Sequence, residues 1–118
     1  MSGNQPLVNI NFDAISQQLK VRPEILKRLI KSFSFSLGGK MASLEQALAK
    51  NDALLMRSIL HEIKGTAGNL RLDTISSAEN VMHEAVKAGE APQKLTEYFA
   101  TLKLRVQELQ EYMAKQES

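Results

Sequence analysis

Apolar residues recur along this chain at steps of three and four, the spacing that places side chains on one face of an α-helix. The longest run follows Pro23 and contains Leu26, Ile30, Phe33, Leu37, Met41, Leu44 and Leu48. Another run, near the C-terminus, keeps the seven-residue period of a heptad and contains Leu95, Phe99, Leu102, Val106, Leu109 and Met113. No segment reads as a convincing strand. The pattern therefore predicts an all-α protein.

Local signals predict where the first three helices begin and end. A short first helix carries the apolar positions of Phe12–Leu19 and ends near Pro23. The long second helix ends at Asn51, and Asp52 can cap the third, because a carboxylate accepts hydrogen bonds from the free N–H groups of a helix start. The third helix runs to about Leu70.

Two further helices complete the pattern. The fourth carries the stripe Ile75, Ala78, Met82 and Ala85. Gly89 is placed to end it, and Pro92 suits the first turn of the fifth helix. Narrow apolar stripes joined by short connections favour antiparallel neighbours. We expect an antiparallel four-helix bundle with a short additional N-terminal helix that caps one end, a single domain over residues 1–118 in which 1–10 and 115–118 are flexible.

Composition narrows the possible functions. The 118 residues are enough for one ordinary domain with one sizeable core, and the chain contains no cysteine for disulfides or thiolate ligands. Its net charge is only +2, and its densest basic stretch, Lys20–Lys31, contains Glu24 and no stacking or base-reading motif, so we expect no nucleic acid partner. We also expect no membrane association and a cytoplasmic location, because no bilayer-length apolar run or signal peptide is present.

The third helix carries the candidate chemistry. With His61 at zero on a helical wheel, the apolar residues fall in an arc from about 120° to about 260°. The members of that arc are Leu55, Met56, Ile59, Leu60, Ile63, Ala67 and Leu70. The arc is centred nearly opposite His61, so the imidazole is predicted to face solvent. A solvent-facing imidazole is not a core histidine.

The neighbours of His61 on the outward face are unusual. Gly65 lies one turn after it and Gly68 two turns after it, although a glycine inside a helix costs about 1 kcal/mol relative to alanine. Their effect is to clear space beside the ring for a large partner. Lys64, at i+3, supplies a positive charge that can pair with phosphoryl oxygens. Imidazole is a plausible acceptor, because a neutral ring nitrogen is a nucleophile. Glu62 is interpreted as a surface charge.

The run from His61 to Leu70, HEIKGTAGNL, closely resembles the phosphoacceptor helix of histidine-containing phosphotransfer (HPt) domains. That family's pattern is His, an apolar residue at +2, Lys at +3, Gly at +4, small residues, then Gly-Asn and Leu. The flanking segments Phe12–Leu19, the long helix bearing Phe33, and HEAVKAGE in the fourth helix are similar too. The chain departs from the common pattern at Arg71-Leu72, which puts only the turn after the helix in doubt.

The resemblance implies a phosphocarrier of a two-component phosphorelay. His61 would accept a phosphoryl group from a receiver-domain aspartate and pass it to another receiver domain. Lys64 would be the charge partner, Gly65 the clearance and Gly68 a close-packing or docking position. The implied partners are receiver domains of response regulators or hybrid histidine kinases. We expect a monomer with no cofactor, no metal and no kinase or phosphatase activity of its own.

Two groups of residues are candidates for receiver docking. Leu54, Arg57 and Ser58 fall on the outward face of His61. Phe35, Gly38 and Gly39 fall at the middle of the second helix, away from the Phe33 stripe. The glycine pair has two open interpretations: a kink or loose section of the helix, or a flat patch that meets a receiver domain beside the acceptor helix.

His83, the only other histidine, is interpreted as a surface residue. A metal site formed by His61 and His83 with Glu79 or Glu84 is conceivable, but the spacing matches no ligand motif.

Two other classes of protein compete with the phosphocarrier. A dimerisation and acceptor fragment of a sensor histidine kinase would share HEIKGT, but its acceptor box usually has proline five residues after the histidine, where this chain has Thr66. The chain also lacks a glycine-rich nucleotide lid. A non-catalytic helical adaptor would explain the bundle. It would not explain why an exposed His, a Lys and two glycines share one face.

Overall fold

The computed structural model describes residues 10–116, and the flexibility expected for residues 1–9 and 117–118 falls outside this range. Within it lie five helices: α1 (Phe12–Leu19), α2 (Pro23–Ala49), α3 (Ala53–Asn69), α4 (Asp73–Lys87) and α5 (Pro92–Lys115). The expected all-α class and the short first helix are confirmed.

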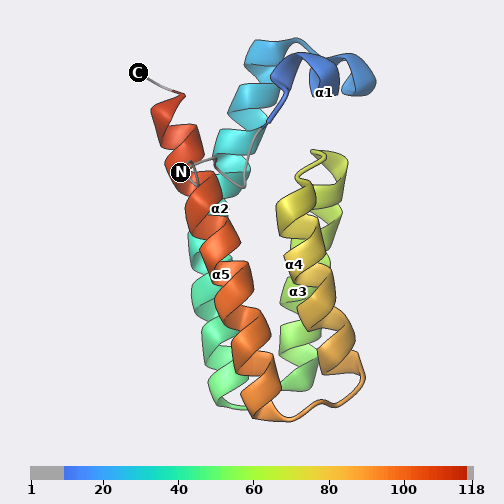
Figure 1. The fold of residues 1–118 in the computed structure, drawn as a ribbon, viewed down its shortest axis with the longest axis vertical. Helices are drawn as coiled ribbons and strands as arrows, with labels where there is room; N and C mark the ends of the chain where they lie inside the picture. Colours follow the sequence, from blue (N-terminus) through green and yellow to red (C-terminus); the bar gives the residue numbers. More distant parts are fainter. Residues whose placement is uncertain (1–9, 117–118) are drawn as a thin grey trace, which may run out of the picture.

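The four long helices form a closed square of neighbours. Helix α2 packs against α3 and α5, and α4 packs against the same two helices. Figure 1 shows that successive long helices run in opposite directions, with α2 and α5 along one side and α3 and α4 along the other. The expected antiparallel four-helix bundle is confirmed, and each long helix keeps an outer face for solvent or partners.

The helix ends follow from the predicted capping residues. The Asp52 carboxylate accepts a hydrogen bond of 3.1 Å from the backbone N–H of Leu55. Gly89 follows α4 with a φ of +71°, a backbone conformation that disfavours side chains larger than hydrogen. Pro92 occupies the first turn of α5, where a missing N–H leaves no bond unmade. These short connections hold the neighbouring helices antiparallel.

The apolar stripes meet in one core. Its largest fully buried side chains include Leu26, Ile30, Leu37, Leu44, Met56, Leu60, Ile63, Ile75, Met82, Leu102 and Leu109. Leu55, which we placed on the buried arc of the third helix, is instead 44% exposed. It lies at the edge of that arc and in the first turn of α3, where the neighbouring helices give little cover.

The chain before α1 is attached to the C-terminal part of α5. Ile10 is buried, and its backbone N–H donates a hydrogen bond of 3.3 Å to the hydroxyl of Tyr112. The rings of Phe12 and Tyr112 stack with centroids 6.4 Å apart. The segments expected to be flexible thus include the buried Ile10 and Lys115, the last residue of α5.

Helix α1 lies across one end of the bundle, as expected, above the connection between α3 and α4 (Figure 1). Arg71 in that connection adopts a left-handed φ of +60°. Its guanidinium donates hydrogen bonds to the Gly68 carbonyl (3.0 Å), the Asn69 carbonyl (3.2 Å) and the Gln18 side chain (3.3 Å). The departure from the family pattern at Arg71 thus ties the end of α3 to α1.

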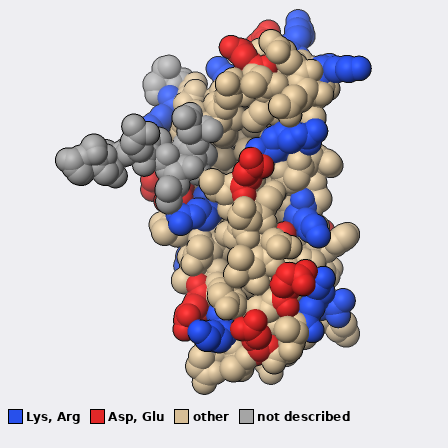
Figure 2. All heavy atoms as spheres, turned by 45° about the vertical axis from the view of Figure 1, so that its right-hand side comes forward, with Lys and Arg blue, Asp and Glu red and all other residues tan. Residues whose placement is uncertain are grey.

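Charged side chains of both signs are mixed on the surface. On the face shown in Figure 2, lysines and arginines lie among aspartates and glutamates, with no broad field of one sign. Among residues 10–116, no helix is both long enough and apolar enough to cross a lipid bilayer.

Candidate functional site

His61 lies at the middle of α3, and its side chain is exposed, as the helical wheel predicts. Gly65 and Gly68 follow it on the same face. A β-carbon built at either glycine would meet no heavy atom within 4 Å, because only open space lies in front of the helix. The glycines therefore do not serve packing within the bundle, and the approach to the imidazole from this side is open.

Lys64 stands one turn after His61 and is exposed. No ion pair among residues 10–116 engages its ammonium. Its positive charge nevertheless acts on helix α4. Burial raises the pKa of Glu79 and Lys64 partly opposes that rise, while Lys87 and, more weakly, Lys64 lower the pKa of Glu84. The ammonium thus lies on the α4 side of the face of α3 that carries His61 (the His61 face) and is available to a bound anion.

An ion pair borders the His61 face of α3 on the side of α2. Lys40 of α2 donates a hydrogen bond of 2.8 Å to the carboxylate of Glu62, the residue next to His61. This hydrogen bond and the lysine's charge lower the pKa of Glu62 below its ordinary value. The pair neutralises a negative charge that would otherwise stand beside the imidazole of His61. Sequence alone did not suggest Lys40, because the pairing depends on how α2 and α3 dock.

A buried polar pair lies on α4. The Glu79 side chain is fully buried, and its Oε2 lies 2.8 Å from Nδ1 of His83. Its other oxygen, Oε1, and the hydroxyl of Ser76 have no hydrogen-bond partner within the described residues. Burial raises the pKa of Glu79, while the neighbouring charges of His83, Lys64 and His61 act in the opposite direction. A partly unsatisfied carboxyl group thus lies within electrostatic range of His61.

Our interpretation of His83 as a surface residue is wrong, since its exposed fraction is only 8%. The register of α4 carried a signal that we did not use. Glu79 is four residues after the core position Ile75, and His83 is four residues after Glu79, so both fall on the inward side. Two polar residues spaced i, i+4 on a buried stripe indicate a buried pair.

The conceivable metal site is not assembled. In residues 10–116, no three histidine, aspartate or glutamate side chains gather in a way that could hold a metal ion. His83 uses its Nδ1 on Glu79 rather than on a site shared with His61.

The family model for the Hpt domain matches residues 28–112, from the first third of α2 to near the end of α5. The chain belongs to the Hpt domain family. The match covers all of α3 and α4 and most of α2 and α5. Comparisons with curated proteins and with solved structures find no significant match.

Membership of the Hpt family gives the chain a phosphotransfer role in two-component signalling. Hpt domains are phosphocarriers rather than enzymes, and they interact with receiver domains. The exposed imidazole, the neighbouring ammonium and the open backbone of α3 lie within the matched part of this Hpt domain.

The docking residues predicted on α3 share the His61 face. Leu54, Arg57 and Ser58 are all exposed on the turns before His61, and Leu54 exposes 77% of its surface. An apolar side chain this exposed, beside a reactive group, suits contact with a partner protein.

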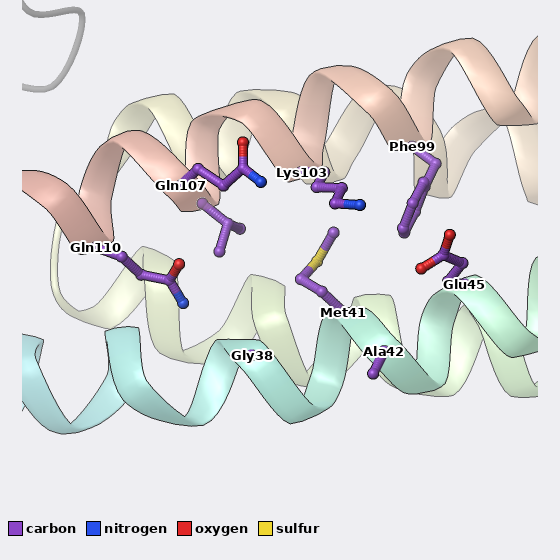
Figure 3. Close-up of a pocket in the computed structure, with 9 residues that line it drawn as sticks. Gly38, Met41, Ala42, Glu45, Phe99, Lys103, Gln107 and Gln110 are labelled. Atoms are coloured by element: carbon purple, nitrogen blue, oxygen red, sulfur yellow. The ribbon is translucent and has the colours of Figure 1, made fainter.

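The docking residues predicted on α2 do not form one patch beside α3. Lys40, which reaches Glu62 on α3, is about 140° around the helix from Phe35. Phe35 and Gly38 instead line a hollow between α2 and α5. Gly38 also lines an adjoining hollow there, drawn in Figure 3. Gly39 is exposed on the outer surface of α2, between the side that faces α3 and the side that faces α5. The glycine pair does not end the helix, because α2 is continuous from Pro23 to Ala49.

The open space at Gly65 leads to a testable expectation. A Gly65→Leu variant should fold at least as stably as the wild type. Leucine favours a helix over glycine by about 1 kcal/mol, and a side chain at this position meets no neighbour. Its phosphotransfer rate should nevertheless fall by at least about tenfold, because the side chain would block close approach to His61. Urea unfolding and the rate of transfer from a labelled receiver domain measure the two effects.

Gly38→Leu is the matched control, since Gly38 is also an exposed helical glycine with open space around its Cα. It should gain similar stability and keep the wild-type transfer rate. Equal slowing by both variants would show that the docking surface extends across α2 to its α5 side.

Proposed function

We propose that His61 accepts a phosphoryl group from the phosphorylated aspartate of one receiver domain and passes it to the aspartate of a second. The observation that carries the proposal is the open face of α3, where an exposed imidazole stands beside an ammonium and two glycines with nothing in front of them.

The chemistry needs little from this chain beyond the nucleophile. A neutral ring nitrogen of His61 attacks phosphorus, an N–P bond forms, and the P–O bond of the aspartyl phosphate breaks. The electron pair of that bond leaves with the receiver's carboxylate. In the second transfer a carboxylate of the other receiver attacks the same phosphorus, and the imidazole leaves. No nucleotide takes part in either step.

The surroundings of His61 favour a negatively charged group at that position. Lys64 offers an ammonium that no ion pair of the described residues engages, and Lys40 occupies the carboxylate of Glu62 at 2.8 Å. Local charge therefore attracts phosphoryl oxygens and does not repel them.

The surface that a receiver domain would cover is centred on His61. It includes Gly65 and Gly68 for close approach, and Leu54, Arg57 and Ser58 for contact on the preceding turns. Gly39 belongs to its margin, because it precedes Lys40, which bridges to α3.

The proposal is tested by asking which donor labels the protein. Labelled ATP alone should leave it unlabelled, whereas a radiolabelled receiver domain should transfer a label that is stable in base and lost in acid, as expected for phosphohistidine. Transfer profiling against every receiver domain of the host then identifies the partners. Labelling by ATP alone, or no labelling by any receiver domain, would contradict the proposal.

Lys64→Ala should slow transfer more than it alters folding. Loss of a charge-assisted hydrogen bond of about 1.5 kcal/mol in the transition state corresponds to about tenfold in rate. The side chain is exposed, so the helical circular dichroism and the unfolding midpoint should stay close to those of the wild type.

Lys94→Ala, which removes an exposed lysine from the first turn of α5, is the control and should transfer at the wild-type rate. Lys64→Arg should recover part of the lost rate, since it restores the positive charge. An unfolded Lys64→Ala protein would show that Lys64 is structural.

A further inference from the structure

The buried pair on α4 ends in a ring nitrogen that reaches the protein surface. The Glu79 carboxylate, 2.8 Å from Nδ1 of His83, holds the imidazole in one orientation. Nε2, the other ring nitrogen, has no hydrogen-bond partner among residues 10–116, yet it is not one of the buried polar atoms. A buried ion pair is often no more stabilising than apolar residues of similar volume. Stability alone therefore does not account for a buried carboxyl group that orients an outward-facing nitrogen.

The pair lies on the side of α4 that faces α3. On the α5 side, Ser77 and Val81 line a hollow together with Arg105 of α5. Glu79 follows Ser77 by two residues and His83 follows Val81 by two residues, and two residues turn a helix by about 200°. Glu79 and His83 therefore point away from that hollow. The charges of Lys64 and His61 on α3 both act on the Glu79 carboxyl group, as this placement requires.

His61 and His83 lie at nearly the same height in the bundle. Helix α3 ends at Asn69, and α4 begins at Asp73. At about 1.5 Å per residue, His61 lies about 12 Å from that end of α3 and His83 about 15 Å from that start of α4. Side chains tilt toward the N-terminus of their own helix, and these two helices run in opposite directions (Figure 1). The two imidazoles therefore lean toward each other along the bundle.

The protonation states of the pair suit an anion at Nε2. With Glu79 ionised and His83 neutral, the proton of the ring is on Nδ1, and Nε2 carries a lone pair. One further proton from solvent puts a hydrogen on Nε2 in either of two forms: an imidazolium beside ionised Glu79, or a neutral ring beside protonated Glu79. A phosphoryl group brings negative charge and acceptor oxygens, so it favours these donor forms.

We propose that His83 is a further phosphoryl-binding residue of this Hpt domain: its Nε2–H, oriented by Glu79, donates a hydrogen bond to an oxygen of the phosphoryl group on His61. The Lys64 ammonium, also on the α4 side of the His61 face, would contact the same group. This inference rests on the proposed function, because it requires a phosphoryl group on His61. It gives the Glu79–His83 pair a task that two apolar residues could not perform.

Nuclear magnetic resonance of the ring nitrogens tests the contact directly. The chain has only two histidines, each with two ring nitrogens, so a protein labelled with nitrogen-15 histidine gives a simple spectrum. Phosphoramidate, a small-molecule phosphoryl donor, loads His61 without any receiver domain. On loading, the Nε2 signal of His83 should move to the position of a protonated nitrogen. A His61→Gln protein treated in the same way is the control and should show no change at His83.

A matched pair of variants separates hydrogen bonding from packing. Both carry Glu79→Met, so that no carboxyl group is buried without a partner. Adding His83→Gln places an amide N–H donor near the position of Nε2, whereas adding His83→Leu leaves no donor. The equilibrium constant for phosphoryl transfer from a receiver domain to the bundle should be at least about tenfold lower with leucine than with glutamine, the effect of one charge-assisted hydrogen bond. Circular dichroism confirms that both proteins remain folded.

The outcomes distinguish this inference from the proposed function. An unchanged Nε2 signal in a protein loaded at His61, or equal equilibrium constants for the two double variants, would overturn the role of His83 and leave the proposed function intact. Failure of every receiver domain to phosphorylate the protein would contradict the proposed function, while a shift of Nε2 after loading by phosphoramidate would still support the contact. Failure of phosphoramidate to load His61 would contradict both.

Discussion

A His61→Gln protein should take no detectable phosphoryl group from a radiolabelled receiver domain, although its five helices remain folded. The amide nitrogen of glutamine is not a nucleophile, so the N–P bond has no atom on which to form. The side chain at this position is exposed, and glutamine is a good helix former, so the bundle loses no packing. Gel autoradiography measures the label, and circular dichroism measures the fold.

Glu62→Gln, a change at the adjacent position, is the control. It breaks the ion pair with Lys40 but leaves the imidazole, so labelling should persist. A His61→Gln protein that still becomes labelled would move the acceptor to another residue. Loss of label in both variants would point instead to damage to the docking face.

Removing only His83 should destabilise the bundle strongly. In His83→Ala the buried carboxyl group of Glu79 loses its 2.8 Å partner at Oε2, while Oε1 already has none among the described residues. Breaking a buried pair in this way typically costs about 3 kcal/mol or more. Replacing both residues with apolar ones, Glu79→Met with His83→Leu, should return the free energy of unfolding to within about 1 kcal/mol of the wild type. Urea denaturation measures all three proteins.

The pH dependence of the free energy of unfolding tests whether the buried carboxyl group of Glu79 contributes to stability. Burial raises the pKa of Glu79 above its ordinary value of 4.5, so the folded protein keeps a proton that the unfolded chain releases. Its contribution to stability is therefore complete below pH 4.5 and is lost as the pH rises through the higher pKa of the folded state. Glu79→Gln should remove this decline with pH. An unchanged decline in that variant, or a stable His83→Ala protein, would contradict the role given to the pair.

The fold was predictable from the sequence because each long helix carries one apolar stripe and clear end signals. Asp52, Gly89 and Pro92 act locally, within a turn of their own position, so their effect is visible in the sequence. The outward direction of His61 followed from the same periodicity. Leu55 was misplaced because it stands where the arc and the helix both begin, and periodicity alone does not show how far a neighbouring helix reaches.

The parts of the site that escaped prediction depend on contacts between helices. The Lys40–Glu62 ion pair joins residues 22 positions apart, and the Arg71–Gln18 hydrogen bond joins residues 53 positions apart. Neither follows from spacing along one helix. Phe35 was grouped with the His61 face because a wheel gives directions around α2 but does not show which helix lies on each side. The packing of α2 between α3 and α5 settles that question.

The position of His61 at the middle of one flat helix face has a consequence for kinetics. Under the proposed function, a receiver domain seated over the ring would hide it from every other protein, so donor and recipient would have to bind in turn. Turnover by that route would follow a substituted, ping-pong scheme, with a phosphorylated bundle released between the two visits. A receiver domain lacking its own aspartate would then act as a competitive inhibitor of both half-reactions.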